Sequence, residues 1–215
     1  MGTTTSPPSR SPQRETVDGR SARERLLASA NELFYAEGVQ TVGIDRIIEH
    51  AGVAKGSLYN LFGSKEGLVR AYLASRHDAT AERILAAVER HRSPRKRLLA
   101  VFEAQGLLFA EPGFRGCAFV AASAEAPTGG LIEHAAGEYR TWMRALFTDL
   151  AAQAGASDPR KLARQLQVVY DGAGLAAGMD GDPSIAHPAR AAAEALLDAS
   201  LEKSGGGTPD RAIPR

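Results

Sequence analysis

The side chains with the clearest chemistry lie in one stretch, residues 44–68, which reads IDRIIEHAGVAKGSLYNLFGSKEGL. Its second half gathers ammonium, hydroxyl and carboxamide groups within a few positions. Such groups donate hydrogen bonds to phosphate oxygens and to the edges of DNA bases. The sequence has no Ser-His-Asp order, no paired carboxylates in an apolar run, no glycine-rich phosphate loop and no metal-ligand spacing. The stretch therefore predicts binding to a polyanion, and the chain is not expected to be an enzyme.

The elements that present these side chains are predicted from the apolar positions among them. Two short amphipathic helices, 44–51 and 56–62, are joined by the turn Gly52-Val53-Ala54-Lys55. A turn this tight makes the helices cross steeply, as they do in a helix-turn-helix. The apolar residues of the second helix face inward: Leu58, Leu61 and Phe62. This leaves a polar outer edge, made of Lys55, Gly56, Ser57, Tyr59 and Asn60.

The polar edge has the composition of a helix that enters the major groove of DNA. Gly56 permits a close approach, and the polar side chains beside it offer hydrogen bonds to base edges. Tyr59 and Lys65 are placed to contact phosphates and thus to fix the register of the helix. Ser64 begins the next helix, whose free amides and dipole add attraction for anions.

This segment resembles the TetR family of transcriptional regulators. The resemblance lies in residues 52–62 and 64–68, and in the preceding helix, 26–34, with its Ala-Glu-Gly end. It is specific over residues 21–75, and beyond them it extends only to the helical plan and the approximate length. It implies a homodimer, a recognition helix at 56–62 and an effector pocket among the C-terminal helices.

One position departs from the resemblance. Many relatives begin the helix before the turn with Thr or Ser, whereas the capping position here is Gly43. Glycine caps a helix acceptably but has no hydroxyl to offer a phosphate. We expect Thr41 or a backbone amide to make that contact instead.

The whole chain is predicted to be all-α, with about nine helices, because the dominant hydrophobic period is helical. A three-helix, homeodomain-like helix-turn-helix head is predicted at 21–66, followed by a helical effector-binding and dimerisation domain at 67–203. Residues 1–20 and 204–215 have few apolar side chains and are predicted to be a disordered arm and tail. The arm carries three arginines that are interpreted as solvated rather than as DNA contacts: Arg10, Arg14 and Arg20.

Several helix ends are predicted from individual capping residues. Ser21 and Glu24 have the spacing of a capping box at the start of the first helix. Gly38 is predicted to end that helix in a left-handed conformation. Ser93 is predicted to cap a later helix with its hydroxyl, one residue before Pro94.

An effector pocket in a helical domain should be mainly apolar and aromatic, with a few polar groups that orient the ligand. Gln105 interrupts an apolar face between Phe102 and Phe109, so its amide needs a partner, which a ligand, a water or a neighbouring helix could supply. The candidate lining residues are Phe102, Gln105, Phe109, Phe119, Tyr139, Trp142, Met143, Leu146 and Tyr170.

The last two long helices are rich in small residues, which let two helix backbones approach closely. We predict that these helices from two subunits form a four-helix bundle. A two-fold axis would then present two recognition helices to successive major grooves, so the operator should be a near-palindrome. The predicted interface residues are Ala173, Gly174, Ala177, Ala192 and Leu196.

Composition limits the remaining possibilities. With 215 residues and a formal net charge of +1, DNA binding must depend on a local basic surface. The single cysteine, Cys117, allows no intramolecular disulfide and is interpreted as a buried, inert thiol. His134 and His187 lack further ligands at metal spacing, so neither a metal nor a cofactor is predicted. With no secretory signal and no apolar run of about 18 residues, we expect a cytoplasmic protein without a membrane partner.

The predicted function is ligand-responsive regulation of transcription. The dimer should bind its operator, with repression favoured over activation, and release it when a small organic effector prefers a wider spacing of the heads. The alternative is a helical module that binds another protein through the head. Salt separates the two, because counterion release predicts a steep loss of DNA affinity between roughly 50 and 200 mM. The effector, the operator sequence and the regulated genes stay open.

Overall fold

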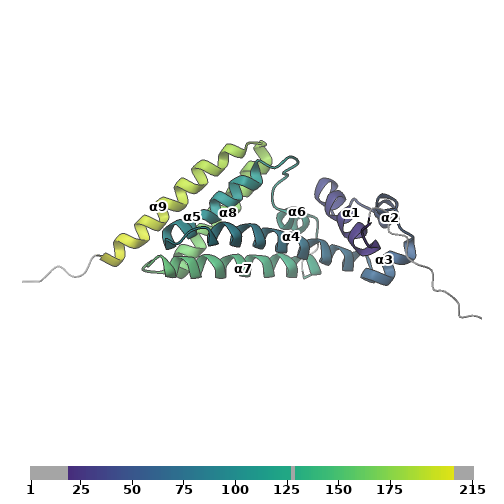
Figure 1. Ribbon diagram of the computed structural model, residues 1–215, viewed down its shortest axis with the longest axis horizontal. Coiled ribbons are helices and arrows are strands. Elements are labelled where there is room, and N and C mark those ends of the chain that lie inside the picture. The colour runs from purple at the N-terminus through teal and green to yellow at the C-terminus, as the bar shows by residue number, and fades with distance from the viewer. Residues whose placement is uncertain (1–18, 127–128, 206–215) are drawn as a thin grey trace, which may run out of the picture.

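A computed structural model describes residues 19–126 and 129–205, with side chains up to Leu201. Within these ranges the chain forms nine α-helices and no strand, which confirms the predicted all-α plan. Figure 1 shows an elongated molecule, with α1–α3 at one end and a bundle of longer helices at the other. Most of the predicted N-terminal arm, with Arg10 and Arg14, and the end of the predicted tail lie outside the described residues.

The first three helices form the head: α1 (Ala22–Glu37), α2 (Ile44–Ala51) and α3 (Lys55–Phe62). Ser21 and Glu24 form the predicted capping box, since Ser21 Oγ accepts from Glu24 N at 3.3 Å and Glu24 Oε2 accepts from Ser21 N at 2.7 Å. Gly38 ends α1 at φ 94° and ψ 152°. Its φ is positive as predicted, but its ψ is extended, so the left-handed helical conformation is not adopted.

The long helix α4 (Lys65–Glu89) joins the head to the rest of the molecule (Figure 1). Its first turn is capped by Ser64 Oγ, which accepts from Gly67 N at 3.1 Å. A Cβ atom at Gly67 would lie 1.9 Å from the carbonyl oxygen of Phe62, so only glycine lets α4 begin this close to the end of α3. Leu68 and Leu73 are fully buried and tie α4 to its neighbours.

The body consists of α5 (Pro94–Phe109), α6 (Ala118–Glu125), α7 (Leu131–Gln153), α8 (Pro159–Asp180) and α9 (Ala186–Gly205), with a short 3₁₀ turn at Pro183–Ile185. Its core centres on Phe102, Met143 and Phe147, each at most 1% exposed. The prediction for Ser93 is wrong in one respect. Ser93 is the N-cap of α5 and precedes Pro94 as predicted, but its hydroxyl makes no capping hydrogen bond.

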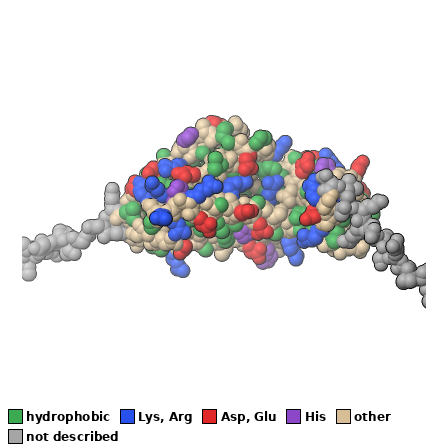
Figure 2. Space-filling view, in the orientation of Figure 1, with side chains coloured by type: hydrophobic (Ala, Val, Ile, Leu, Met, Phe, Trp, Pro, Cys, Tyr) green, Lys and Arg blue, Asp and Glu red, His purple; other side chains and the backbone are tan. Residues whose placement is uncertain are grey.

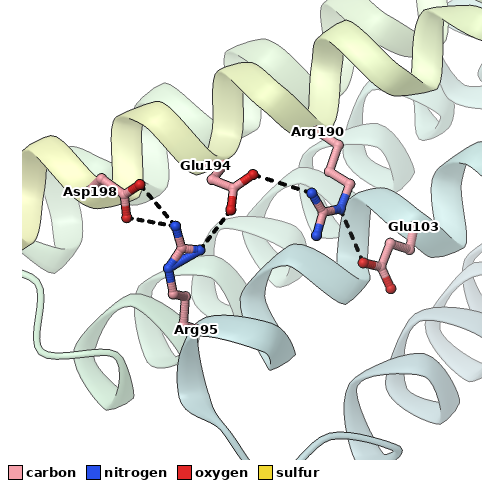
Figure 3. Close-up of polar contacts among 5 residues, drawn as sticks. All are labelled: Arg95, Glu103, Arg190, Glu194 and Asp198. Atoms are coloured by element: carbon pink, nitrogen blue, oxygen red, sulfur yellow. Dashed lines mark hydrogen bonds and ion pairs between the residues drawn. The ribbon is translucent and has the colours of Figure 1, made fainter.

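A chain of ion pairs fastens α9 to α5 (Figure 3). Arg95 donates to both carboxylate oxygens of Asp198 at 2.8 Å and to Glu194 at 2.9 Å. Arg190 donates to Glu194 at 3.3 Å and to Glu103 at 3.1 Å. The network supplements the apolar contacts that hold the last helix in place.

On the face shown in Figure 2, acidic and basic side chains are interspersed over the body and the head. None of the helices in the described part of the chain is long and apolar enough to cross a membrane. Within the same residues, no three His, Cys, Asp or Glu side chains gather as a metal site would require.

Candidate DNA-binding surface and ligand cavity

The second helix of the helix-turn-helix, α3, has one apolar anchor and one polar edge. Leu58 is fully buried, whereas Tyr59 on the next position is 45% exposed. Lys55, Gly56 and Asn60 are exposed as well, and Ser57 is half-buried. A Cβ at Gly56 would meet nothing within 4 Å, so another surface can approach the backbone there closely. The residues predicted for DNA contact on α3 therefore lie along its edge, with Ser57 set further in than expected.

Both helices of the helix-turn-helix begin without a side-chain cap. Gly43 precedes α2 and Ala54 precedes α3, and neither supplies a capping hydrogen bond. The first amides of these two helices are therefore left without a side-chain acceptor. Free amides at a helix N-terminus are donors suited to phosphate oxygens. Thr41, which lies two residues before Gly43, is exposed and could add its hydroxyl.

The two lysines of the predicted contact surface are engaged within the head. Lys55 Nζ lies 2.8 Å from Asp45 Oδ1, and Lys65 Nζ donates to the carbonyl oxygen of Gln40 at 3.4 Å. Over residues 21–66 the head carries five Lys and Arg against six Asp and Glu. The positive potential of the head therefore depends on where its individual lysines and arginines lie, and acidic neighbours such as Asp45 reduce it.

A cavity of about 120 Å³ lies in the body where α4, α5, α6, α7 and α8 meet. Its volume is close to the ~150 Å³ of a buried cavity that admits benzene. Aromatic side chains form much of its wall, including Phe119 stacked on Tyr139 with ring centroids 4.3 Å apart. Phe109 packs against Phe114 with centroids 5.1 Å apart. The space has the size and lining of a site for a single aromatic ring.

Five of the nine predicted pocket residues line this cavity: Gln105, Phe109, Phe119, Tyr139 and Tyr170. The other four do not. Phe102 and Met143 belong to the closed core, Leu146 is half-buried against it, and Trp142 packs on His77 with centroids 5.1 Å apart. Aromatic type and helical spacing alone did not distinguish a wall of a cavity from the core behind it.

Gln105 finds the partner that its buried amide requires on a neighbouring helix. Its Nε2 donates to the backbone oxygen of Tyr170 at 2.8 Å, which ties α5 to α8 beside the cavity. Burial raises the pKa of Tyr170 and raises that of Tyr139 well above its usual value, so both phenols stay neutral.

Cys117 is half-buried and lines the cavity. Desolvation raises the pKa of its thiol, which keeps the sulfur protonated and weakly nucleophilic at neutral pH. This supports its interpretation as an inert thiol, although the side chain is less buried than expected.

The polar residues of the cavity on α4 were missed by the sequence reasoning. Arg76, Thr80 and Arg83 line it, together with Asp171 on α8. On the sequence they resemble the solvated side of an amphipathic helix. The one available signal was Arg76, which lies four residues after Tyr72 and interrupts an otherwise apolar face.

Tyr35 links the head to the wall of the cavity. It belongs to α1, yet its hydroxyl donates to the carbonyl oxygen of Gly116 at 2.9 Å and accepts from Arg115 N at 2.8 Å. The guanidinium of Arg76 lies over the Tyr35 ring, 4.1 Å from its centroid. A movement of the cavity wall between α5 and α6 would therefore act directly on α1 through the hydrogen bonds of Tyr35.

The small residues of α8 are used inside the protomer. Ala173, Gly174 and Ala177, predicted for a dimer interface, are buried within the chain. A Cβ at Gly178 would lie 2.9 Å from Gly116 Cα, so the close approach that these residues permit is to the segment before α6. The exposed apolar side chains of α8 lie on its other face: Val168, Leu175 and Met179.

This geometry agrees with what comparisons with known proteins show. A family model described as bacterial regulatory proteins of the tetR family matches residues 26–72. A solved structure of a TetR-family transcriptional regulator from Streptomyces coelicolor is 34% identical in sequence, and the match covers 84% of this chain and 96% of that one, with a TM-score of 0.80. The chain belongs to the TetR family. It is a transcriptional regulator with a DNA-binding helix-turn-helix, as the resemblance predicts.

The curated relatives of the chain include both a repressor and an activator. The transcriptional repressor NemR of Escherichia coli is 32% identical over 105 residues, which are 48% of this chain and 53% of that protein. The transcriptional activator FasR of Mycolicibacterium smegmatis is 37% identical over 82 residues, 38% of this chain and 37% of that one. The chain thus spans about half or less of the length of these curated relatives. The relatives named here are regulators rather than enzymes, in line with the expectation from the sequence.

Proposed function

We propose that this TetR-family protein is a homodimeric repressor that binds a near-palindromic operator and releases it when a small organic molecule enters the cavity. The observation that carries the proposal is the polar edge of α3, held outward by the fully buried Leu58. Donors on that edge, with the uncapped amides of α2 and α3, suit base edges and phosphates. Such a regulator would act in the cytoplasm, with the chromosome.

The proposed dimer uses the outer faces of α8 and α9. Val168 and Met179 are 71% and 77% exposed, an unusual exposure for large apolar side chains that share one helix face. On α9, Ala192 is exposed and Leu196 is half-buried, so these two predicted interface residues keep surface for a partner. Pairing these faces around a two-fold axis would set the two α3 helices at a fixed spacing.

Repression needs nothing more than occupancy, since a dimer on an operator excludes other proteins from the same DNA. Release would follow if the ligand-bound body prefers a different spacing of the heads. The contacts of Tyr35 with the segment before α6 give the cavity a direct connection to α1.

Fluorescence anisotropy on labelled DNA fragments that tile the sequence flanking the gene tests the proposal. A tight fragment should lose at least tenfold affinity with Lys55→Ala or Tyr59→Ala, and far less with Lys96→Ala, which removes an exposed lysine from the body. Affinity should fall steeply between roughly 50 and 200 mM salt. If no fragment binds better than unrelated DNA, or if both α3 variants bind normally, the protein-binding alternative replaces this function.

A further inference from the structure

The cavity contains one cationic group without an acidic partner. Arg76 lines it from α4, and no Asp or Glu of the described residues forms an ion pair with it. Its Nη2 donates to the backbone oxygen of Asn31 at 3.1 Å, while its Nε is buried with no hydrogen-bond partner. A buried donor of a charged group that lacks an acceptor is costly, so the Arg76 guanidinium is left with unmet hydrogen-bonding capacity beside the cavity.

The other charges around the cavity are already compensated. Arg83 pairs with Glu111 at 3.1 Å, and Asp171 pairs with Arg140 at 2.6 Å. Since arginines neutralise both carboxylates, Glu111 and Asp171 offer little attraction to a cationic ligand. The charge that remains without a partner is the positive charge of Arg76, which one negative charge on a ligand would balance.

The rest of the wall selects the shape of the ligand. Phe109, Phe114 and Phe119 present aromatic surface to a space of about 120 Å³, which suits one ring rather than a fused or extended ring system. A guanidinium binds a carboxylate with two parallel hydrogen bonds, which a monoanion of this size could provide.

We propose that the cavity binds a small monocyclic aromatic carboxylate, with the carboxylate on Arg76 and the ring among the three phenylalanines. The inference rests on the proposed effector role of the cavity and names its ligand class. Because Arg76 also holds Asn31 of α1 and lies over Tyr35, the carboxylate competes for the group that fastens the head. The same guanidinium would therefore recognise the ligand and transmit its presence.

Benzoate, with benzamide as its uncharged counterpart, is a direct probe. Trp142 is the only tryptophan, and its ring centroid lies 6.2 Å from that of Tyr139 in the cavity wall, so its fluorescence can follow a titration of the full chain. We expect benzoate to bind at least ~tenfold more tightly than benzamide, as a charge-assisted hydrogen bond to arginine predicts. Arg76→Gln should abolish that preference, and Arg70→Gln, the same change at an exposed arginine of α4 that does not line the cavity, should keep it.

Equal affinities of the wild type for the two probes, no binding of either at millimolar concentration, or a preference that survives in Arg76→Gln would overturn the inference. If Arg76→Gln does not fold, as judged by circular dichroism, the benzoate-to-benzamide ratio of the wild type decides. The DNA titrations without ligand are independent of this result. A preference for benzoate in a protein that binds no DNA would leave the ligand class standing and remove the repressor function.

Discussion

Lys55 Nζ donates a 2.8 Å hydrogen bond to Asp45 Oδ1 and thereby joins the first turn of α3 to the first turn of α2. This hydrogen bond raises the pKa of Lys55, so the amine is charged at neutral pH. Both side chains are well exposed, so the pair itself adds little to folding stability. The pair matters for DNA binding instead, because a phosphate that binds Lys55 must compete with Asp45 for its ammonium group.

Replacing Asp45 with asparagine should therefore tighten DNA binding, by about threefold at low salt. The substitution frees Lys55 and removes a negative charge from the surface proposed to face the phosphates. Anisotropy titrations on the best fragment would measure the change, with Glu82→Gln on the body as a charge-matched control that should have no effect. Weaker binding by Asp45→Asn would show that Asp45 positions Lys55 rather than competing for it.

Tyr35→Phe should lower the free energy of unfolding by about 1–2 kcal/mol, because the backbone groups of Gly116 and Arg115 lose their partner. Urea denaturation would measure the loss. Tyr59→Phe removes a hydroxyl from an exposed ring of the same head and should leave stability unchanged. Equal stability of the two variants would mean that water replaces the Tyr35 hydroxyl without cost.

Gly178→Ala should destabilise the protein by about 1–3 kcal/mol, since its methyl group would overlap the backbone of Gly116. Gly137→Ala is the matched control. That glycine is exposed within α7, and a methyl group there would meet nothing within 4 Å, so alanine should stabilise by up to ~1 kcal/mol through helix propensity. Thermal unfolding of the pair should show shifts of opposite sign. A stable Gly178→Ala protein would indicate that the segment before α6 moves readily.

Arg95→Ala should cost on the order of 1 kcal/mol of unfolding free energy, because the arginine joins two carboxylates of α9 but is partly exposed (Figure 3). The neighbouring Lys96→Ala should cost much less. The difference between the two variants should shrink as salt screens the network. Denaturation at low and at high ionic strength would measure it, and a difference that does not depend on salt would assign the effect to packing instead.

Leu175→Asp should convert the proposed dimer into a monomer, because it places a charge in the middle of the exposed apolar face of α8. Sedimentation velocity would give the mass. Leu107→Asp changes an equally apolar side chain, 64% exposed on α5, and should leave the assembly intact. A dimer that survives Leu175→Asp would move the interface away from α8.

The sequence by itself determined the helices and the helix-turn-helix, because these depend on local information. The period of apolar residues, the capping box at Ser21 and the glycine at 52 act over a few positions. The two short helices predicted at 44–51 and 56–62 are observed at Ile44–Ala51 and Lys55–Phe62. The polar edge of α3 follows from the same short-range pattern. Even here, Gly38 and Ser93 took local conformations that composition alone did not specify.

Only the tertiary structure decided which faces meet. Gly174 and Ala177 suit a close contact between any two backbones, and their sequence contains nothing that distinguishes a second copy of the chain from the chain's own α6 segment. Arg76 resembles a solvated arginine until the fold brings Phe109 and Phe119 around it. Pairings such as Tyr35 with Gly116 join positions 81 residues apart, and a contact of that range is set by the packing of whole helices rather than by either residue.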